Sequence, residues 1–184
     1  MDDQHVCPFH HRWVLTIAGR KLLNNPTRIL RPLLQPGMTA LDVGCGVGYF
    51  TIPMARLIGD AGRVIAVDVQ PEMLAVMAAN ATKASCGNIT AHQCDAATLG
   101  VSEWAGTVDF AMLFYMLHEA NDPANLIAEV GDALKPGGKL LFAEPIMHVD
   151  APGFARSAAL FTKAGLHEIG TPRIPISRAA IFEK

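Results

Sequence analysis

The sequence lacks three features that would each point to a different class of protein. Its four cysteines, Cys7, Cys45, Cys86 and Cys94, show no Cys-x-x-Cys spacing, which favours reduced thiols. No apolar run approaches the roughly 18 to 20 residues that span a bilayer. The start, MDDQHVCPFHHRW, is acidic and polar, unlike a basic region followed by an apolar secretion signal. These absences predict a cytoplasmic protein with no membrane span.

Clustered positive charge is also missing. The chain has 15 Lys and Arg against 17 Asp and Glu, a net charge of −2, and the basic residues are scattered. Nucleic-acid binding normally needs a basic patch or stripe, so we expect a small-molecule substrate and no nucleic acid. With 184 residues, 51% of them hydrophobic, the chain is long enough for one domain with a full core. We expect a single domain over residues 26–184 behind an N-terminal segment of residues 1–25.

Short β-rich runs alternate with helical patterns, which favours crossover units on a parallel sheet. Strands are expected at residues 38–43, 62–69, 89–94, 107–117 and 139–145, with a closing hairpin of 172–176 and 178–184. Helices are expected at residues 25–34, 49–59, 70–85, 122–134 and 154–165. Pro26, Pro71 and Pro123 suit first helical turns, Pro32 should kink its helix, and residues 135–138 should turn. The chain is therefore an α/β protein with seven strands.

Three glycines follow the first predicted strand, in the stretch ALDVGCGVGYFT. Glycines between a strand and a helix let a ligand approach the backbone, where the helix also presents free N–H groups. Dinucleotide enzymes use G-x-G-x-x-G for a pyrophosphate. Gly44 and Gly46 fit that pattern, but Tyr49 holds its last position and the third glycine, Gly48, comes one residue early. A nicotinamide dehydrogenase is therefore disfavoured, and a ligand without a pyrophosphate is favoured.

Acidic residues end three consecutive predicted strands at the edge where the glycines lie. Asp42 stands in an apolar strand end, where a buried carboxylate needs a partner such as an amino group or a bound water. Asp68 comes 24 residues after Gly44, near the spacing at which an acid meets ribose hydroxyls. Asp95 is placed to accept from an exocyclic adenine amine. The three acids suit a ligand with an amine, a ribose, an adenine and a positive charge. Each could instead be an ordinary acid of a turn.

Five motifs in this order resemble the class I S-adenosylmethionine-dependent methyltransferases: LDVGCGVG, VIAVDVQPEML, CDA, VDFAMLFYMLHE and LKPGGKLLFAEP. Among these enzymes the chain is most similar to the small-molecule methyltransferases of the quinone-biosynthesis type. The likeness is close from Pro36 to Pro145. It implies a Rossmann-like three-layer sandwich whose seven-stranded, mostly parallel sheet has an antiparallel last strand. It also implies S-adenosyl-L-methionine as cofactor and S-adenosyl-L-homocysteine as product.

The resemblance assigns the cofactor-binding residues. It implies that Asp42, Gly44 and Gly46 hold the methionine part and that Asp68 takes the ribose. Val69 and Met73 would flank the adenine, whose edge would meet Asp95 and Ala96. Phe114, at the end of the fourth predicted strand, joins these candidates.

The acceptor site is expected beside the methyl group, at the end of the fourth strand. The sulfonium already carries an activated methyl group, so the protein mainly has to align a nucleophile and exclude water. A thiolate or free amine needs no base, whereas a phenol or alcohol benefits from one near pKa 7, which suits histidine. His118 is the first candidate for a base or orienting residue, with Tyr115 beside it; His118 could instead cap a helix or face solvent.

Glu119 and Asn121 lie near the same mouth, and Glu144 and His148, after the fifth strand, are weaker candidates for substrate contact.

The N-terminal segment HVCPFHHRWVL brings Cys7, His10 and His11 within a few positions. A zinc site needs four ligands, and no second pair is recognisable, so we expect no metal. The segment could instead form a lid over the substrate pocket or a mobile terminus anchored by Trp13.

A non-catalytic cofactor-binding sensor or accessory subunit is the alternative to an enzyme. A pocket lined by Tyr115 and His118 would favour the enzyme, whereas a flat apolar patch would favour a surface that binds a partner. Monomer and homodimer both remain open.

Overall fold

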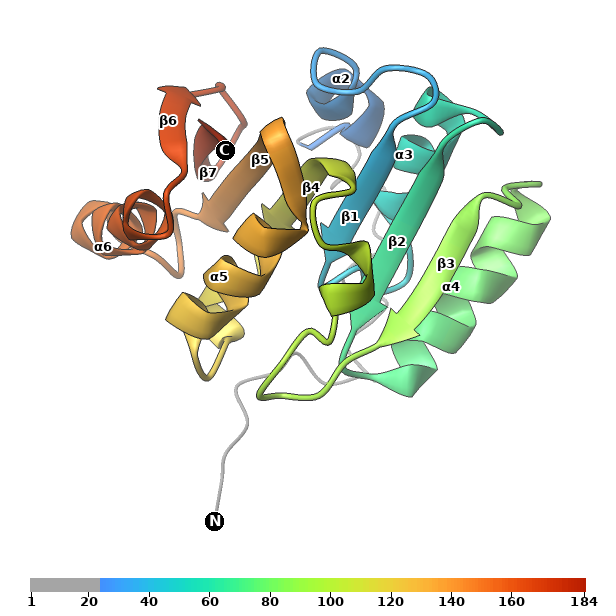
Figure 1. Ribbon diagram of the computed structural model, residues 1–184, viewed down its shortest axis with the longest axis horizontal. Helices are drawn as coiled ribbons and strands as arrows, with labels where there is room; N and C mark the ends of the chain where they lie inside the picture. The colour runs from blue at the N-terminus through green and yellow to red at the C-terminus, as the bar shows by residue number, and fades with distance from the viewer. Residues whose placement is uncertain (1–23) are drawn as a thin grey trace.

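A seven-stranded sheet forms the centre of the computed structural model, which describes residues 24–184 (Figure 1). The strands are β1 (Thr39–Val43), β2 (Arg63–Asp68), β3 (Ile89–Gln93), β4 (Val108–Phe114), β5 (Leu134–Pro145), β6 (His167–Gly170) and β7 (Ser177–Glu183). Their order in the sheet is β3-β2-β1-β4-β5-β7-β6. The first five strands pair in parallel, and β7 runs antiparallel to both neighbours. This confirms the expected α/β sheet and its antiparallel last strand.

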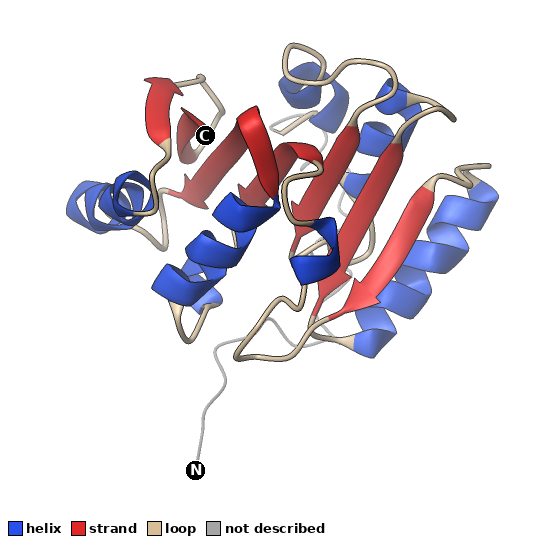
Figure 2. Cartoon of the chain, viewed as in Figure 1, coloured by secondary structure: helices blue, strands red, loops and turns tan. Residues whose placement is uncertain are grey.

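Helices cover both faces of the sheet (Figure 2). The helices are α2 (Pro26–Leu30), α3 (Thr51–Ile58), α4 (Pro71–Lys83), η3 (Ser102–Trp104), η4 (Leu117–Glu119), α5 (Pro123–Ala133) and α6 (Ala151–Lys163). Side chains of α2, α3 and α4 pack on one face, and those of α5 and α6 on the other. In the described part of the chain, no helix is long and apolar enough to cross a membrane.

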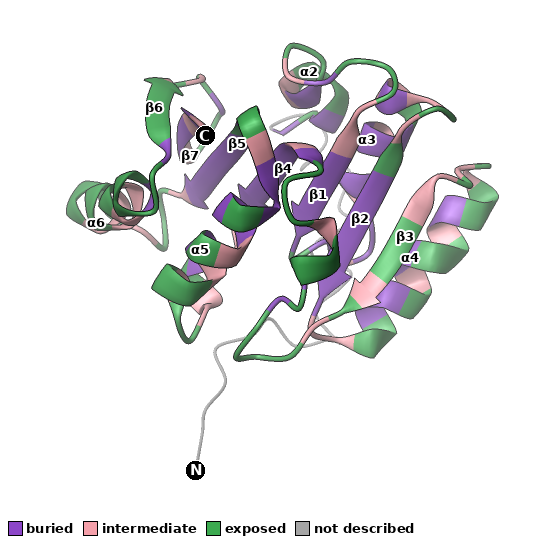
Figure 3. Ribbon diagram, viewed as in Figure 1, coloured by how far each residue is buried: buried purple, intermediate pink, exposed green. Residues whose placement is uncertain are grey.

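The two faces of the sheet explain why its central strands are almost continuously apolar. In β1, Ala40 packs toward α2 and α3, while Leu41 and Val43 pack toward α5. Successive strand residues point to opposite faces, and both faces of a covered parallel sheet are buried. Figure 3 shows the central strands buried along most of their length, whereas β6 and the outer side of α6 are exposed. Against this apolar background, Asp42 is an exception that has to be explained by its partners.

Proline and side-chain caps fix where several helices begin. Pro26, Pro71 and Pro123 each open a helix, as expected, since proline's missing N–H has no partner in the first turn. The kink expected at Pro32 is wrong: α2 ends at Leu30, before the position where proline would remove a helical hydrogen bond. The caps Asn25 and Asp122 accept from backbone N–H groups three residues on.

The closing hairpin uses a different first strand from the expected one. Strand β6 is His167–Gly170, and residues 172–176 form no strand, because Pro172 and Pro175 cannot donate to a ladder. The turn expected at 135–138 interrupts β5, whose pairing with β4 jumps from Leu134 to Lys139. The turn at 135–138 lies away from the carboxyl ends of β1 to β5, where the site forms. Residues 172–176 instead reach the carboxyl end of β5, where the N–H of Ile146 donates to the carbonyl of Ile176 at 3.1 Å.

Candidate active site

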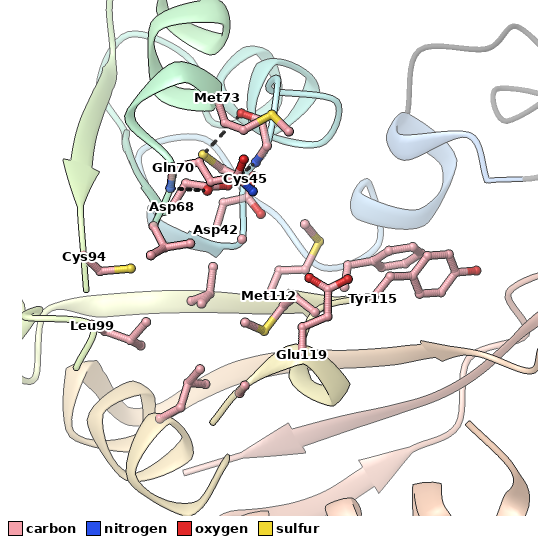
Figure 4. A pocket seen from close by; sticks show the side chains of 18 of the residues that line it. Asp42, Cys45, Asp68, Gln70, Met73, Cys94, Leu99, Met112, Tyr115 and Glu119 are labelled. Atoms are coloured by element: carbon pink, nitrogen blue, oxygen red, sulfur yellow. Dashed lines mark hydrogen bonds between the residues drawn. The ribbon is translucent and has the colours of Figure 1, made fainter. Parts of the chain in front are cut away.

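A cavity of about 660 Å³ opens at the carboxyl ends of β1, β2 and β4 (Figure 4). It is lined by all eleven residues expected to form the site: Asp42, Gly44, Gly46, Asp68, Val69, Met73, Asp95, Ala96, Phe114, Tyr115 and His118. Apolar side chains supply much of the remaining wall. The residues predicted from the sequence therefore lie together in one cavity, and the role of each of them stays a prediction.

The glycine loop after β1 is bound to β2 by its backbone. The N–H groups of Gly44 and Cys45 both donate to the carbonyl of Val67, at 2.9 and 3.0 Å. Gly44 and Gly46 have φ of +72° and +53°, in the left-handed region where a side chain is strained. A Cβ added at Gly44 would also lie 3.0 Å from Cβ of Met116. A Cβ added at Gly46 would have no neighbouring atom within 4 Å.

Asp68 holds this loop in place while facing the cavity. Its Oδ2 accepts the backbone N–H of Gly46 at 2.8 Å, and its Oδ1 accepts that of Gln70 at 2.9 Å. The residue is 8% exposed, and burial raises the pKa of its carboxyl. Figure 4 shows Asp68 beside Gln70 on the wall below Met73. A carboxylate here accepts bonds from the protein and has oxygen lone pairs left for a ligand.

Asp42 is the most deeply buried acid of the cavity, at 2% exposure. The hydroxyl of Thr51, at the start of α3, donates to its Oδ2 at 2.6 Å. The pKa of Asp42 is raised to about 7: burial is the main cause, the Thr51 bond opposes it, and the charge of Asp68 adds a smaller increase. A cationic group in the cavity would compensate both acids, because an opposite charge favours the ionised form.

The adenine side of the expected site combines an exposed acid with apolar walls. Asp95 follows β3, and its Oδ1 accepts the backbone N–H groups of Ala97 and Thr98 at 2.7 and 2.8 Å. Leu99 and Met73 lie on the cavity wall nearby. The turn that Asp95 makes is the ordinary structural role of such an acid, and it leaves further acceptor capacity toward the cavity.

Two cysteines also line the cavity, and neither is poised as a nucleophile. Burial, together with the nearby acids, raises the pKa of Cys45 above its usual range and that of Cys94 to about 11. Both are thiols at neutral pH, and a thiol is a poor nucleophile. Cys45 is thus a small residue of the glycine loop rather than a reactive group.

Strand β4 ends three residues earlier than expected because the chain turns at Tyr115. This residue has φ of +62°, which ends the extended backbone at Phe114 and leads into η4. The backbone N–H of Tyr115 donates to the carbonyl of Ala143 at 2.9 Å. Its hydroxyl accepts from Nδ2 of Asn24 at 3.0 Å and is hydrogen-bonded to Oγ of Ser177. Its ring lines the cavity, and its hydroxyl connects three segments that are distant in the sequence.

His118 is held from behind by Glu144. Nδ1 of His118 lies 2.6 Å from Oε2 of Glu144, and the backbone N–H of His118 donates to Oε1 at 3.0 Å. Glu144 is 1% exposed and is not among the residues that line the cavity, so this geometry does not support the substrate contact considered for it. The hydrogen bond from Glu144 is the main cause that raises the pKa of His118. His148 lies edge-on to His118, with ring centroids 5.6 Å apart.

Several contacts of the site left no signal in the sequence. Thr51 and Met116 sit in ordinary helical and loop contexts, and nothing in the sequence marks them as partners of Asp42 and Gly44. The motif with Cys7, His10 and His11 lies outside the described residues. Among residues 24–184, no three His, Cys, Asp or Glu side chains gather where they could hold a metal ion.

Comparison with known proteins agrees with this geometry. A family described as "Methyltransferase domain" matches residues 34–168. The chain is 34% identical over 112 residues to the ubiquinone/menaquinone biosynthesis C-methyltransferase UbiE of Teredinibacter turnerae, covering 60% of this chain and 44% of that protein. It is 31% identical over 131 residues to the aklanonic acid methyltransferase DauC of a Streptomyces species, covering 71% and 56%. The chain spans about half the length of these curated relatives.

The fold has a counterpart in a solved structure. A SAM-dependent methyltransferase from Aquifex aeolicus superposes with a TM-score of 0.87, covering 97% of this chain and 99% of that one, at 22% identity. At this identity the likeness concerns the fold.

Proposed function

Because this chain belongs to the methyltransferase domain family, we propose that it transfers a methyl group from S-adenosylmethionine to a small-molecule acceptor. S-adenosylhomocysteine and the methylated acceptor are the products. One observation carries this proposal: a single cavity contains a glycine loop and two buried acids at one end, and a histidine paired with a buried glutamate at the other.

The residues present fit the cofactor. Asp42 and Asp68 are buried carboxyl groups whose pKa values are raised, and a ligand with an amino group and a sulfonium would favour their ionised forms. Val69, Met73 and Leu99 offer the apolar wall that an adenine ring needs. Among residues 24–184, no Lys or Arg side chain lines the cavity, which disfavours a pyrophosphate-bearing dinucleotide.

When bound, S-adenosylmethionine supplies an activated methyl group, so the protein needs no covalent nucleophile. Gly44, Gly46, Asp42 and Asp68 are assigned to the methionine and ribose parts. Asp95, Ala96 and Phe114 are assigned to the adenine side and the central wall. The apolar walls exclude water, and His118 orients the acceptor or takes its proton. These are the contributions of the protein to an in-line transfer.

A concave pocket lined by Tyr115 and His118 supports catalysis rather than a flat partner surface, so we prefer the enzyme to a non-catalytic sensor or accessory subunit. We further propose a cytoplasmic location, no nucleic-acid partner, and a monomer or homodimer.

Isothermal titration of the purified protein tests this function. S-adenosylmethionine and S-adenosylhomocysteine should both bind with micromolar dissociation constants, and NAD should not bind. Failure of both adenosyl ligands, or binding of NAD in their place, would contradict the proposal.

A further inference from the structure

The contact between His118 and Glu144 fixes which nitrogen of the imidazole carries the proton. An ionised glutamate only accepts hydrogen bonds, and both of its oxygens face nitrogens of the same residue: the backbone N–H at 3.0 Å and Nδ1 at 2.6 Å. Nδ1 must therefore carry a hydrogen. In the neutral ring Nε2 is then left with its lone pair, on the side of the ring away from Glu144.

The other charged groups around this pair do not compete for that arrangement. Glu119, also on the cavity wall, has its Oε1 3.9 Å from Nε2, beyond hydrogen-bond distance. His148 meets the ring of His118 edge-on. Arg178, which is opposite Glu144 on β7, donates instead to the carbonyl of Val149 at 2.8 Å. Glu144 thus has His118 as its hydrogen-bond partner.

We propose that Glu144 is a positioning residue that presents Nε2 of His118 as a proton acceptor, and that the methyl group is received by a hydroxyl oxygen on a flat aromatic or enolic ring. This proposal rests on the proposed function and adds the class of acceptor to it.

The class of acceptor follows from what a proton acceptor is needed for. A thiol, with a pKa near 8.5, ionises by itself at neutral pH to a useful extent, whereas a phenolic hydroxyl, with a pKa near 10, does not. A base beside the methyl group is therefore of most use to a hydroxyl.

The walls near His118 favour a flat ring. The ring of Phe114 packs against those of Phe50 and Tyr115, with centroids 4.4 Å apart and ring planes tilted by 41° and 38°, and all three rings line the cavity with Met112. Aromatic faces of this kind pack well against another ring.

The proton and electrons balance without any further reactant. The acceptor oxygen forms its bond to the methyl carbon as the carbon–sulfur bond breaks, and the electron pair of that bond stays on sulfur as a neutral thioether. The hydroxyl proton passes to Nε2, and His118 becomes an imidazolium paired with Glu144. His118 then releases this proton to water once the products leave.

The substitution Glu144→Gln tests the positioning role directly. A glutamine offers one acceptor and one donor, and the backbone N–H of His118 can only donate. The amide oxygen therefore takes the backbone N–H and the amide N–H₂ faces Nδ1, which moves the ring proton to Nε2. Nitrogen-15 NMR of the imidazole, without any cofactor, should show hydrogen on Nδ1 in the wild type and on Nε2 in the variant. The pKa of His118 should fall in the variant.

The matched control is Glu183→Gln on β7, where Glu183 pairs with Lys139 at the other end of the β5–β7 ladder, and this change should leave the imidazole spectrum unchanged. Glu144→Asp keeps an acceptor-only group and should keep the proton on Nδ1. An unchanged tautomer in a folded Glu144→Gln protein would overturn the positioning role. If Glu144→Gln does not fold, loss of the Nδ1 proton signal in Glu144→Asp would overturn it instead.

Methyl transfer tests the acceptor class, with a panel of hydroxynaphthalenes, the matching naphthalenethiols and the matching amines. With Glu144→Gln, we expect kcat for the hydroxyl compounds to fall about 100-fold, with the KM for S-adenosylmethionine within about twofold. Transfer to thiols should change less than threefold. Transfer to thiols, amines or ring carbon but to no hydroxyl, or transfer to none of the panel by a protein that binds the cofactor, would overturn the acceptor class. Absence of cofactor binding in the wild type would instead contradict the proposed function, and the NMR result would still stand.

Discussion

The two ends of the cavity are built in different ways. At the end formed by β1 and β2, Asp68 accepts a backbone group, the N–H of Gly46, and the side-chain pair of Asp42 and Thr51 is only nine residues apart. At the end formed by β4 and β5, side chains meet over longer separations, as with His118 and Glu144, 26 residues apart.

The difference separates what a fold family shares from what is particular to one chain. Strand ends and a glycine loop bind a cofactor through backbone geometry, whereas the acceptor end depends on individual side-chain pairs. Substitutions at the first end should therefore change cofactor affinity, and those at the second should change the transfer rate.

The largest effect should come from Asp68→Ala. This change removes the charge-assisted hydrogen bonds to Gly46 in the glycine loop and to Gln70, as well as the proposed ribose contact. Affinity for S-adenosylhomocysteine should therefore fall about 1,000-fold, about 4 kcal/mol. Asp95→Ala is the control, because Asp95 is an exposed acid at the same edge, and its loss should weaken binding only about tenfold. Titration calorimetry measures both. Equal losses of affinity in the two variants would contradict the larger role in cofactor binding that is assigned to Asp68.

Next comes the pH dependence of stability without ligand. Asp42 keeps its proton to about pH 7 when folded but ionises near pH 4 when unfolded, so the folded state binds more protons between these values. Stability should therefore decrease as pH rises, by about 3 kcal/mol between pH 5 and pH 8. Urea unfolding of the wild type and Asp42→Asn measures this. The variant should lose most of the slope and keep only the smaller part due to Asp68; identical slopes would rule out Asp42 as the source.

His118→Gln probes the acceptor end. Removing the imidazole should lower kcat about 100-fold, about 2.7 kcal/mol, and leave the dissociation constant of S-adenosylhomocysteine within about twofold. Steady-state kinetics and calorimetry together separate the two ends. A variant that loses cofactor affinity but keeps its kcat would place His118 at the wrong end of the cavity.

The contact between Gly44 and Met116 joins the two ends, and a pair of alanine substitutions measures it. Gly44→Ala and Gly46→Ala both put a side chain at a left-handed φ, which costs about 1 kcal/mol, but only the first brings a Cβ against Met116. We expect about 2 kcal/mol of destabilisation for Gly44→Ala and about 1 kcal/mol for Gly46→Ala in urea. Met116→Gly removes the Cβ and Cγ that would lie 3.0 and 3.2 Å from the new side chain, so it should cost less stability in the Gly44→Ala protein than in the wild type. Equal costs in the two proteins would show that this contact is irrelevant to stability.

The smallest effect is expected for Tyr115→Phe, which keeps the ring and removes the hydroxyl bonds to Asn24 and Ser177. Unfolding free energy should fall by about 1 kcal/mol, with kcat within about threefold. A loss of kcat beyond thirtyfold at unchanged stability would make the hydroxyl a catalytic group instead.

The sequence allowed more to be predicted at the cofactor end than at the acceptor end. Asp42, Asp68 and Asp95 could be placed together because parallel strands bring their carboxyl ends to one edge, whatever the packing. Glu144 was also placed at a strand end, but its contact with His118 was not predicted. That contact depends on η4 turning His118 back onto it, which follows from the left-handed backbone at Tyr115.

The errors in the fold have similarly local causes. Strand β6 was missed because its residues are mostly exposed and show no apolar alternation. The prolines beside it belong to a loop that happens to contain apolar residues.

The central claim is that the methyl group of the bound cofactor points from the glycine loop toward the end of β4. The most direct test is NMR of the protein with S-adenosylmethionine carrying a carbon-13 methyl group. Cross-relaxation from the methyl protons should reach the ring protons of Tyr115 and His118 in the wild type. Cross-relaxation to Leu99 and Met73 instead, with none to those rings, would place the methyl group at the wrong end and contradict the account.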